Sequence, residues 1–397
     1  MHNGLHERSS PGAGAMDPQG VLTGQTDTRG ARLKRGLALV STAAAIALMA
    51  ACGESSNPFP TPSSTPPPPP VGSPSPSPRP LDLKPVLAGL LDRNGTPPPA
   101  FLPSLAGFVV NVYWSDLQPT SGATLAANNA IDRAITEVRS LNANDHTDLG
   151  LKIRLFTGIW APGWVKNLGG SPIAIVNPQA GNTATIGRFW TDAYGAAYDR
   201  LETLLAAKYD SVPEVREVTI ARCTTFYDEP FIRDSNAPAT VSALIAAGYT
   251  LSADESCQEQ EIQASTVWQH THSDLAFNPY QAIAPTGSAS VDESFTESMM
   301  QYCRQVLGTA CVLENNSLRD TPAGAAYNSM YASMSQLGAP IAFQTATAVR
   351  IGSLAQVITY AVSLGANSVE LPAGYESIET PTAFASDTRI LATNRAA

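Results

Sequence analysis

One acidic segment of the chain contains residue types that could act in acid–base chemistry. Asp228 and Glu229 precede Pro230 in the stretch TTFYDEPFI, directly after the apolar run VREVTIARC. A carboxylic acid can protonate a leaving group at neutral pH when burial or an adjacent carboxylate raises its pKa. Asp228 and the neighbouring aromatic residues supply both conditions. We therefore expect Glu229 to be a general acid or to contact a ligand; a polar loop that ends at a proline is the alternative.

Two more glutamates and one arginine occupy strand-like stretches. Glu314 ends one apolar run, and Glu370 lies between two apolar residues of another. Side chains alternate across a strand, so Glu370 should face a cleft or a barrel interior if its neighbours face helices. Arg154 lies in a third run, where it could bind a hydroxyl group, hold Glu229 or Glu370, or form an interior ion pair.

Aromatic and amide side chains gather where the strand-like stretches end. Trp114 ends such a stretch, and Asn278 lies near the end of another. Trp160, Tyr227 and Tyr375 each follow one. Sugar rings present apolar C–H faces that stack on aromatic planes, while amides bind hydroxyl groups. We expect these residues to line a cleft for an oligo- or polysaccharide; packing in the core is the alternative for a tryptophan.

The elements that position these residues alternate in type. Strand-like stretches lie at 84–91, 107–114, 151–159, 215–223, 273–280, 310–315, 340–346 and 366–372, and between most of them apolar residues recur at spacings of three and four. Such alternation predicts parallel strands covered by helices. Eight strands predict an α/β fold, a single (β/α)8 barrel with functional residues at the C-terminal strand ends. An open doubly wound sheet is the alternative, but neither a GxGxxG motif nor a P-loop appears in the first βα unit.

The first 80 residues predict export rather than a folded domain. A basic and then apolar segment (29–51) precedes Cys52 and resembles a bacterial lipoprotein signal, with Met1 or Met16 as the start. We assign 1–52 to this signal and 53–80, rich in Pro and Ser, to an extended linker. Residues 81–397 form the barrel. We expect an exported cell-surface protein, anchored in the membrane by lipid at Cys52; an ordinary secretory signal is the alternative.

Four cysteines remain in the barrel domain, and an even number in an exported domain suggests disulfides. Three pairings are possible, and the local one joins Cys303 to Cys311 and Cys223 to Cys257. No Cys/His spacing indicates zinc, so we expect neither a metal nor an organic cofactor. The formal net charge of −10 argues against a nucleic-acid partner. We expect a monomer.

Six segments together resemble a known family. They are WSDLQP (114–119), RLFTGIWAPGWV (154–165), TTFYDEPF (224–231), LENNSL (313–318), IAFQTAT (341–347) and GANSVELPAGY (365–375). In this order they look like the strand ends of secreted bacterial glycoside-hydrolase-like TIM barrels. The layout is similar to the retaining clan of β-glycosidases that includes cellulases, mannanases and β-galactosidases. The resemblance covers most of residues 84–376 and implies hydrolysis of a glycosidic bond, with Glu229 as general acid/base.

The chain departs from that clan at two positions. Asp228 stands where the clan has an asparagine that holds a sugar hydroxyl, and Gln344 stands where its nucleophile ends the seventh strand. An amide cannot be that nucleophile. Glu314 is the preferred substitute and Glu370 the second choice, because strand eight lies across the barrel from strand four. Gln344 would contact sugar in either case, and it supports an alternative function, a non-catalytic carbohydrate-binding barrel on the cell surface.

Overall fold

The computed structural model describes residues 82–94, 97–145, 147–177, 182–232, 235, 237–321 and 324–394. The predicted signal and linker, Cys52 included, lie outside the described residues.

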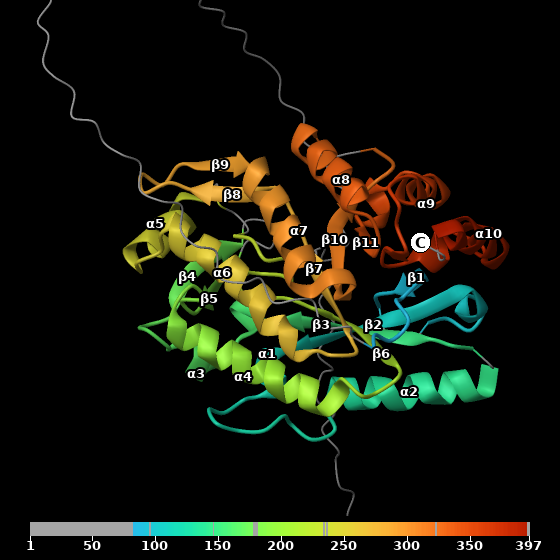
Figure 1. Ribbon diagram of the computed structural model, residues 1–397, viewed down its shortest axis with the longest axis horizontal. Coiled ribbons are helices and arrows are strands. Elements are labelled where there is room, and N and C mark those ends of the chain that lie inside the picture. Colours follow the sequence, from blue (N-terminus) through green and yellow to red (C-terminus); the bar gives the residue numbers. More distant parts are fainter. Residues whose placement is uncertain are drawn as a thin grey trace, which may run out of the picture. The chain divides into compact units, whose positions relative to one another are not determined.

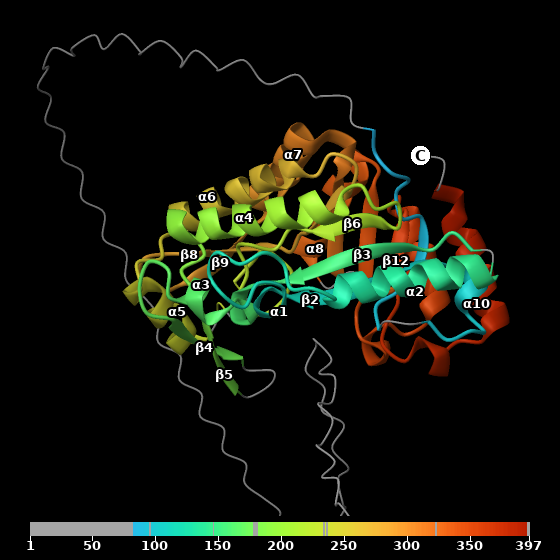
Figure 2. The same ribbon diagram turned by 90° about the horizontal axis from the view of Figure 1, so that it is seen from below.

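Eight parallel strands close into a barrel in the order β1-β12-β11-β10-β7-β6-β3-β2 (Figures 1 and 2). They are β1 (Gly89–Asp92), β2 (Leu105–Tyr113), β3 (Gly150–Phe156), β6 (Val215–Thr219), β7 (His272–Ala276), β10 (Cys311–Leu318), β11 (Ile341–Thr345) and β12 (Ser368–Glu370). Each overlaps one strand-like stretch of the sequence. The predicted (β/α)8 barrel is therefore confirmed.

Helices surround the barrel between its strands. The longer ones are α2 (Ala130–Asp145), α4 (Asp192–Tyr209), α6 (Leu251–Ala264), α7 (Glu293–Leu307), α8 (Ala325–Leu337), α9 (Leu354–Ser363) and α10 (Pro381–Leu391); α1 (Trp114–Leu117), α3 (Gly163–Lys166) and α5 (Pro238–Ala246) lie in loops. Helix α7 illustrates the local signals. The Asp292 side chain accepts a hydrogen bond from the Phe295 N–H, and Gly308 ends the helix with a φ of 59°. Both are standard helix-end devices.

Two antiparallel hairpins that the periodicity did not predict follow the C-terminal ends of barrel strands. β4 (Ile173–Asn177) pairs with β5 (Asn182–Ile186) after β3, and β8 (Tyr280–Ile283) pairs with β9 (Ala289–Asp292) after β7. Both hairpins and α5 lie at the left end of the barrel in both views (Figures 1 and 2). They build up one side of the barrel mouth, where the strands end.

The barrel interior holds both apolar and charged groups. Leu87, Leu91 and Val109 form a small apolar cluster, separate from the main core between strands and helices. Charged positions adjoin this cluster, because Lys152 pairs in register with Val109 and Glu370 with Leu91. Arg154 lies two residues farther along β3. The interior therefore carries the charged groups on which a site could be built.

Two disulfides brace the domain. Cys223–Cys257 spans 6.0 Å between Cα atoms and Cys303–Cys311 spans 5.9 Å, which confirms both predicted local pairings. Disulfides persist in oxidising compartments and indicate an exported protein. Within the residues described, no helix is both long and apolar enough to cross a membrane.

Candidate active site

A single lysine lies at the centre of the barrel interior, surrounded by carboxylates. The Nζ atom of Lys152 lies 3.2 Å from Glu217, 2.8 Å from Asp274, 2.7 Å from Glu314 and 2.9 Å from Glu370. All five side chains are at most 1% exposed. A buried ammonium group is tolerated only when charges and hydrogen bonds compensate its lost hydration. One cation facing four carboxylates leaves an excess of negative charge.

Arg154 links this interior to the acidic segment at the mouth. It lies two residues beyond Lys152 on β3, so both side chains face inward. Its Nη2 donates to Glu370, and its Nε lies 3.1 Å from the Asp228 carboxylate. Of the roles expected for Arg154, the structure supports an ion pair that holds Glu370. The second partner of Arg154 is Asp228, the residue that precedes Glu229 in the sequence.

The carboxylates differ in protonation because their neighbours differ. Burial alone would raise the pKa of Glu370, but Arg154 and Lys152 lower it to about 2. Burial and the nearby Asp274 carboxylate raise the pKa of Glu314 well above its ordinary value, against the opposing effect of Lys152. Burial likewise raises the pKa of Asp274. At neutral pH Glu370 is therefore ionised, whereas the pKa values of Glu314 and Asp274 are shifted in the opposite direction, toward the protonated form.

This cluster should make the protein less stable as the pH rises. The pKa values of Asp274 and Glu314 are higher in the folded chain than in the unfolded chain, so folding takes up protons. These two carboxyl groups contribute their full stabilisation at pH values below about 4, the pKa of a carboxyl group in the unfolded chain. The contribution is lost as the pH rises toward their pKa values in the folded chain. The lowered pKa of Glu370 changes stability in the opposite direction, but only at pH values below the pKa of a glutamate in the unfolded chain. We expect the thermal midpoint to fall between about pH 5 and about pH 8.

Thermal unfolding across that range checks the prediction, with Asp274→Asn as the test variant. The amide cannot bind the extra proton, so the slope of the midpoint against pH should become shallower. Asp192→Asn on the exposed surface of α4 should keep the slope of the parent. Equal slopes in all three proteins would contradict the assignment.

The loop after β6 presents Asp228 and Glu229 at the barrel mouth. It approaches the loop after β3 so closely that a Cβ at Gly158 would lie 2.1 Å from the Thr225 carbonyl oxygen. The Ile159 N–H donates to that same oxygen at 2.9 Å. Asp228 and Glu229 are 4% and 7% exposed. Two barrel loops thus hold the acidic pair in a largely dehydrated position, as expected from the sequence.

Several residues expected to bind sugar surround this region. Trp160 is half-buried, and its ring packs against Tyr113 with the centroids 4.4 Å apart and the planes 36° apart. Tyr227 and Asn278 are also half-buried, and Gln344 is 6% exposed at the end of β11. Their positions at strand ends agree with the expected layout. Whether they contact a sugar remains a prediction.

Two of the expected cleft residues belong to the core instead. Trp114 is fully buried and packs edge-on against Trp164, Tyr194 and Tyr198. Tyr375 is also fully buried and donates a hydrogen bond to Asp92 at 2.9 Å. A short helical turn begins at each of these residues, directly after β2 for Trp114 and beyond the end of β12 for Tyr375. The prediction of a cleft position was wrong for both.

Sequence reasoning missed the inward polar residues that were not at strand ends. Lys152 could have been found, because it alternates with Arg154 in an otherwise apolar strand. Higher in the interior, buried polar atoms without a hydrogen-bond partner occur on Asn111 (Oδ1), Asn278 (Nδ2) and Thr345 (Oγ1). Buried polar atoms usually find partners, so these three are candidates to bind a hydroxylated ligand. In the part of the chain that is described, no group of three or more His, Cys, Asp or Glu side chains could hold a metal ion.

Comparisons with known proteins return similar structures only. No family model matches the chain. No curated protein matches it either. The catalytic domain of a β-amylase from Paenibacillus polymyxa is 10% identical, with a TM-score of 0.46 over 77% of this chain and 99% of that one. An endo-glycoceramidase II from Rhodococcus sp. is 13% identical, with a TM-score of 0.40 over 72% and 74%. A β-galactosidase from Marinomonas ef1 is 12% identical, with a TM-score of 0.40 over 77% and 59%.

Proposed function

We propose that this barrel hydrolyses glycosidic bonds, with Glu229 as the general acid. The observation that carries the proposal is a pair of ion pairs that share Arg154. The arginine joins Asp228, the neighbour of Glu229, to the ionised Glu370 in the interior. Glycoside hydrolysis uses one carboxylic acid to protonate the leaving oxygen and one carboxylate as nucleophile or base. A buried acid beside a carboxylate, in a loop that Arg154 ties to an ionised carboxylate, supplies the two kinds of group that this chemistry uses.

Glu370 is a better second carboxylate than Glu314, contrary to the order expected from the sequence. A nucleophile or base must be ionised, which suits Glu370 and disfavours Glu314. Glu370 also pairs in register with Gln344 on the neighbouring strand β11. Gln344 stands where the glycosidase clan has its nucleophile, so a carboxylate on the next strand at the same level is a plausible replacement for it.

The mouth suits a neutral sugar. The half-buried Trp160 offers an aromatic face already braced by Tyr113. The half-buried Asn278 carries an amide that can bind hydroxyl groups. The ionised Glu370 would repel an anionic sugar at close range. An uncharged oligo- or polysaccharide therefore fits the groups at the mouth best.

A carbohydrate-binding barrel without activity is the second candidate, and one observation favours it. Glu370 and Glu314 are at most 1% exposed, and both are ion-paired with Lys152. A carboxylate in that position must become accessible before it can attack a sugar. With Gln344 at the strand-seven position, the barrel could bind a glycan and leave it intact.

A panel of neutral and acidic polysaccharides separates these functions. The purified protein is incubated with each glycan, and both binding and released reducing sugar are measured. Hydrolysis of at least one neutral glycan supports the enzyme. Binding without release supports the binding barrel. No binding and no release across the panel would contradict both.

We further propose that the protein is a lipoprotein held at the cell surface through Cys52. The basic and apolar segment before Cys52 motivates this, and the disulfides agree with export. Cys52→Ser removes the thiol that would carry the lipid. We expect this variant to leave the membrane fraction or to remain unprocessed, whereas Ser56→Ala should fractionate like the parent. Membrane attachment that persists in Cys52→Ser would refute the anchor.

A further inference from the structure

Helix α6 contacts the loop that carries Glu229 at three points. Cys257 is bonded to Cys223, and the Gln258 Nε2 donates to the carbonyl oxygen of Pro230 at 2.7 Å. Glu261 accepts backbone N–H bonds from Arg222 at 2.8 Å and Cys223 at 2.9 Å through the same oxygen, Oε2. Residues 257, 258 and 261 share one face of a helix. These contacts therefore hold both ends of the segment 222–230.

The three α6 side chains are unusually buried for their types. Cys257 is 1%, Gln258 5% and Glu261 0% exposed. Glutamate is almost never fully buried without a partner, and here the partners are backbone groups of one loop. Burial raises the pKa of Glu261 to about 8, although the two backbone N–H groups oppose this shift. We therefore attribute the burial of Glu261 to the loop backbone that it holds.

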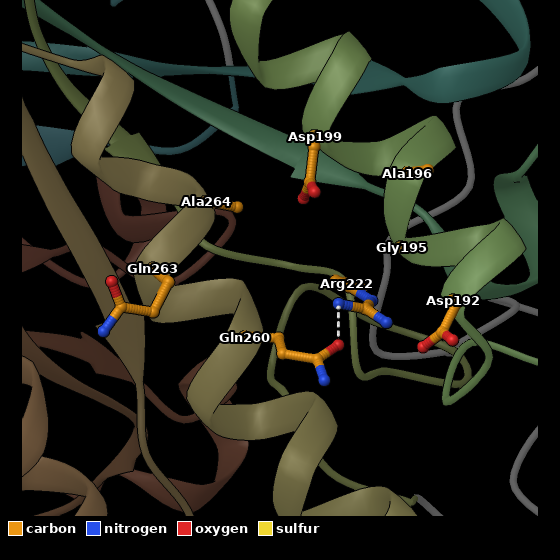
Figure 3. A pocket seen from close by; sticks show the side chains of 8 residues that line it. All are labelled: Asp192, Gly195, Ala196, Asp199, Arg222, Gln260, Gln263 and Ala264. Carbon is orange, nitrogen blue, oxygen red and sulfur yellow. Dashed lines mark hydrogen bonds between the residues drawn. The ribbon is translucent and has the colours of Figure 1, made fainter.

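The same loop is anchored from its outer side. The Arg222 side chain enters a pocket of about 410 Å³ between α4 and α6, where its Nη1 donates to Gln260 at 2.9 Å (Figure 3). Its Nε donates to the Phe189 carbonyl oxygen at 3.1 Å. Gly195 on α4 makes this possible, because a Cβ there would lie 2.5 Å from the guanidinium group. The loop is thus tied to α6 and to the segment that precedes α4 before it reaches the mouth.

We propose that Glu261 and Gln258 are positioning residues for Glu229, an inference that rests on the function proposed above. Neither contacts the interior cluster. Between β6 and α5 the described residues form no helix or strand, so the position of Glu229 depends on side-chain contacts to the loop backbone. A small displacement of a catalytic group lowers the rate more than it lowers substrate binding. Loss of either contact should therefore reduce kcat and leave KM nearly unchanged.

The test compares Glu261→Ala, Glu261→Gln and Gln258→Ala with Glu259→Ala, an exposed neighbour on α6. We expect Glu261→Ala and Gln258→Ala to lower kcat about 10- to 100-fold with KM within about threefold. Glu261→Gln keeps an acceptor oxygen, so it should retain kcat within about threefold of the parent. Glu259→Ala should behave as the parent. Gln258→Ala keeps the experiment informative if Glu261→Ala does not fold.

Amide hydrogen exchange of residues 220–232 provides a readout that needs no activity. Exchange in this loop should accelerate in Glu261→Ala and Gln258→Ala, while the barrel strands stay protected. If the parent hydrolyses nothing but the loop still opens in these variants, the anchoring stands and the proposed function fails. If the parent is active and both kcat and loop exchange match those of Glu259→Ala, the positioning role is overturned.

Discussion

Replacing Lys152 with methionine should destabilise the protein by about 3–5 kcal/mol, the cost of removing one partner from a buried ion pair. Methionine has nearly the same length, so the change mainly removes charge. The change removes the ammonium group that lies 2.7–3.2 Å from four carboxylates, which would then face each other; they are Glu217, Asp274, Glu314 and Glu370. Denaturant unfolding of parent and variant at about pH 7 measures the difference.

Two controls isolate the charge effect. Lys208→Met removes a lysine whose pair with Asp132 is partly exposed, and it should cost at most about 1 kcal/mol. Adding Asp274→Asn to Lys152→Met removes one repelling carboxylate, so the double variant should be more stable than Lys152→Met alone. The deficit of Lys152→Met should also shrink toward about pH 5, where carboxyl groups bind protons. A deficit as small as that of Lys208→Met would contradict the central role of Lys152.

The barrel was predictable from the sequence because its strands are short, largely apolar runs and most of them are followed by a helical pattern. Strands such as β3 and β10 are buried along nearly their whole length, which is the pattern of a parallel sheet covered by helices. The hairpins β4–β5 and β8–β9 were not predictable in this way. Their strands are four or five residues long, and β9 is mostly exposed, so they carry no periodic signal.

The acidic loop of the candidate site was predictable from the sequence, but the depth of its other carboxylates in the barrel was not. Glu229 and Asp228 could be placed because a strand ends shortly before them and a proline follows. The relative depth of Glu314 and Glu370 could not be read in the same way. It depends on strand register: Glu314 pairs with Ala342, whereas Glu370 pairs with Gln344, two residues closer to the mouth. The alternation of side chains predicts which face of a strand Glu314 and Glu370 occupy, but their depth depends on the stagger of the strands around the closed barrel.

Replacing Glu229 with glutamine should remove about 3–6 kcal/mol of transition-state stabilisation if Glu229 is the general acid. An amide keeps the size and an acceptor oxygen but has no proton to transfer. Glu370→Gln should cause a loss of similar size, because the nucleophile or base must be ionised. Burial and Asp274 raise the pKa of Glu314, which makes it the poorer nucleophile or base, so Glu314→Gln should change kcat/KM by less than about tenfold.

Three measurements distinguish this mechanism from simple loss of structure. Sugar affinity should survive Glu229→Gln within about 1 kcal/mol, because an amide preserves the shape of the mouth. The alkaline limb of the kcat/KM profile, which reports the acid of the free enzyme, should disappear in this variant. Glu259→Gln, on the exposed face of α6, should retain the activity and profile of the parent. If Glu229→Gln hydrolyses as fast as Glu259→Gln, Glu229 is not the acid. If Glu314→Gln is inactive and Glu370→Gln is active, the second carboxylate is Glu314, as the sequence alone had indicated.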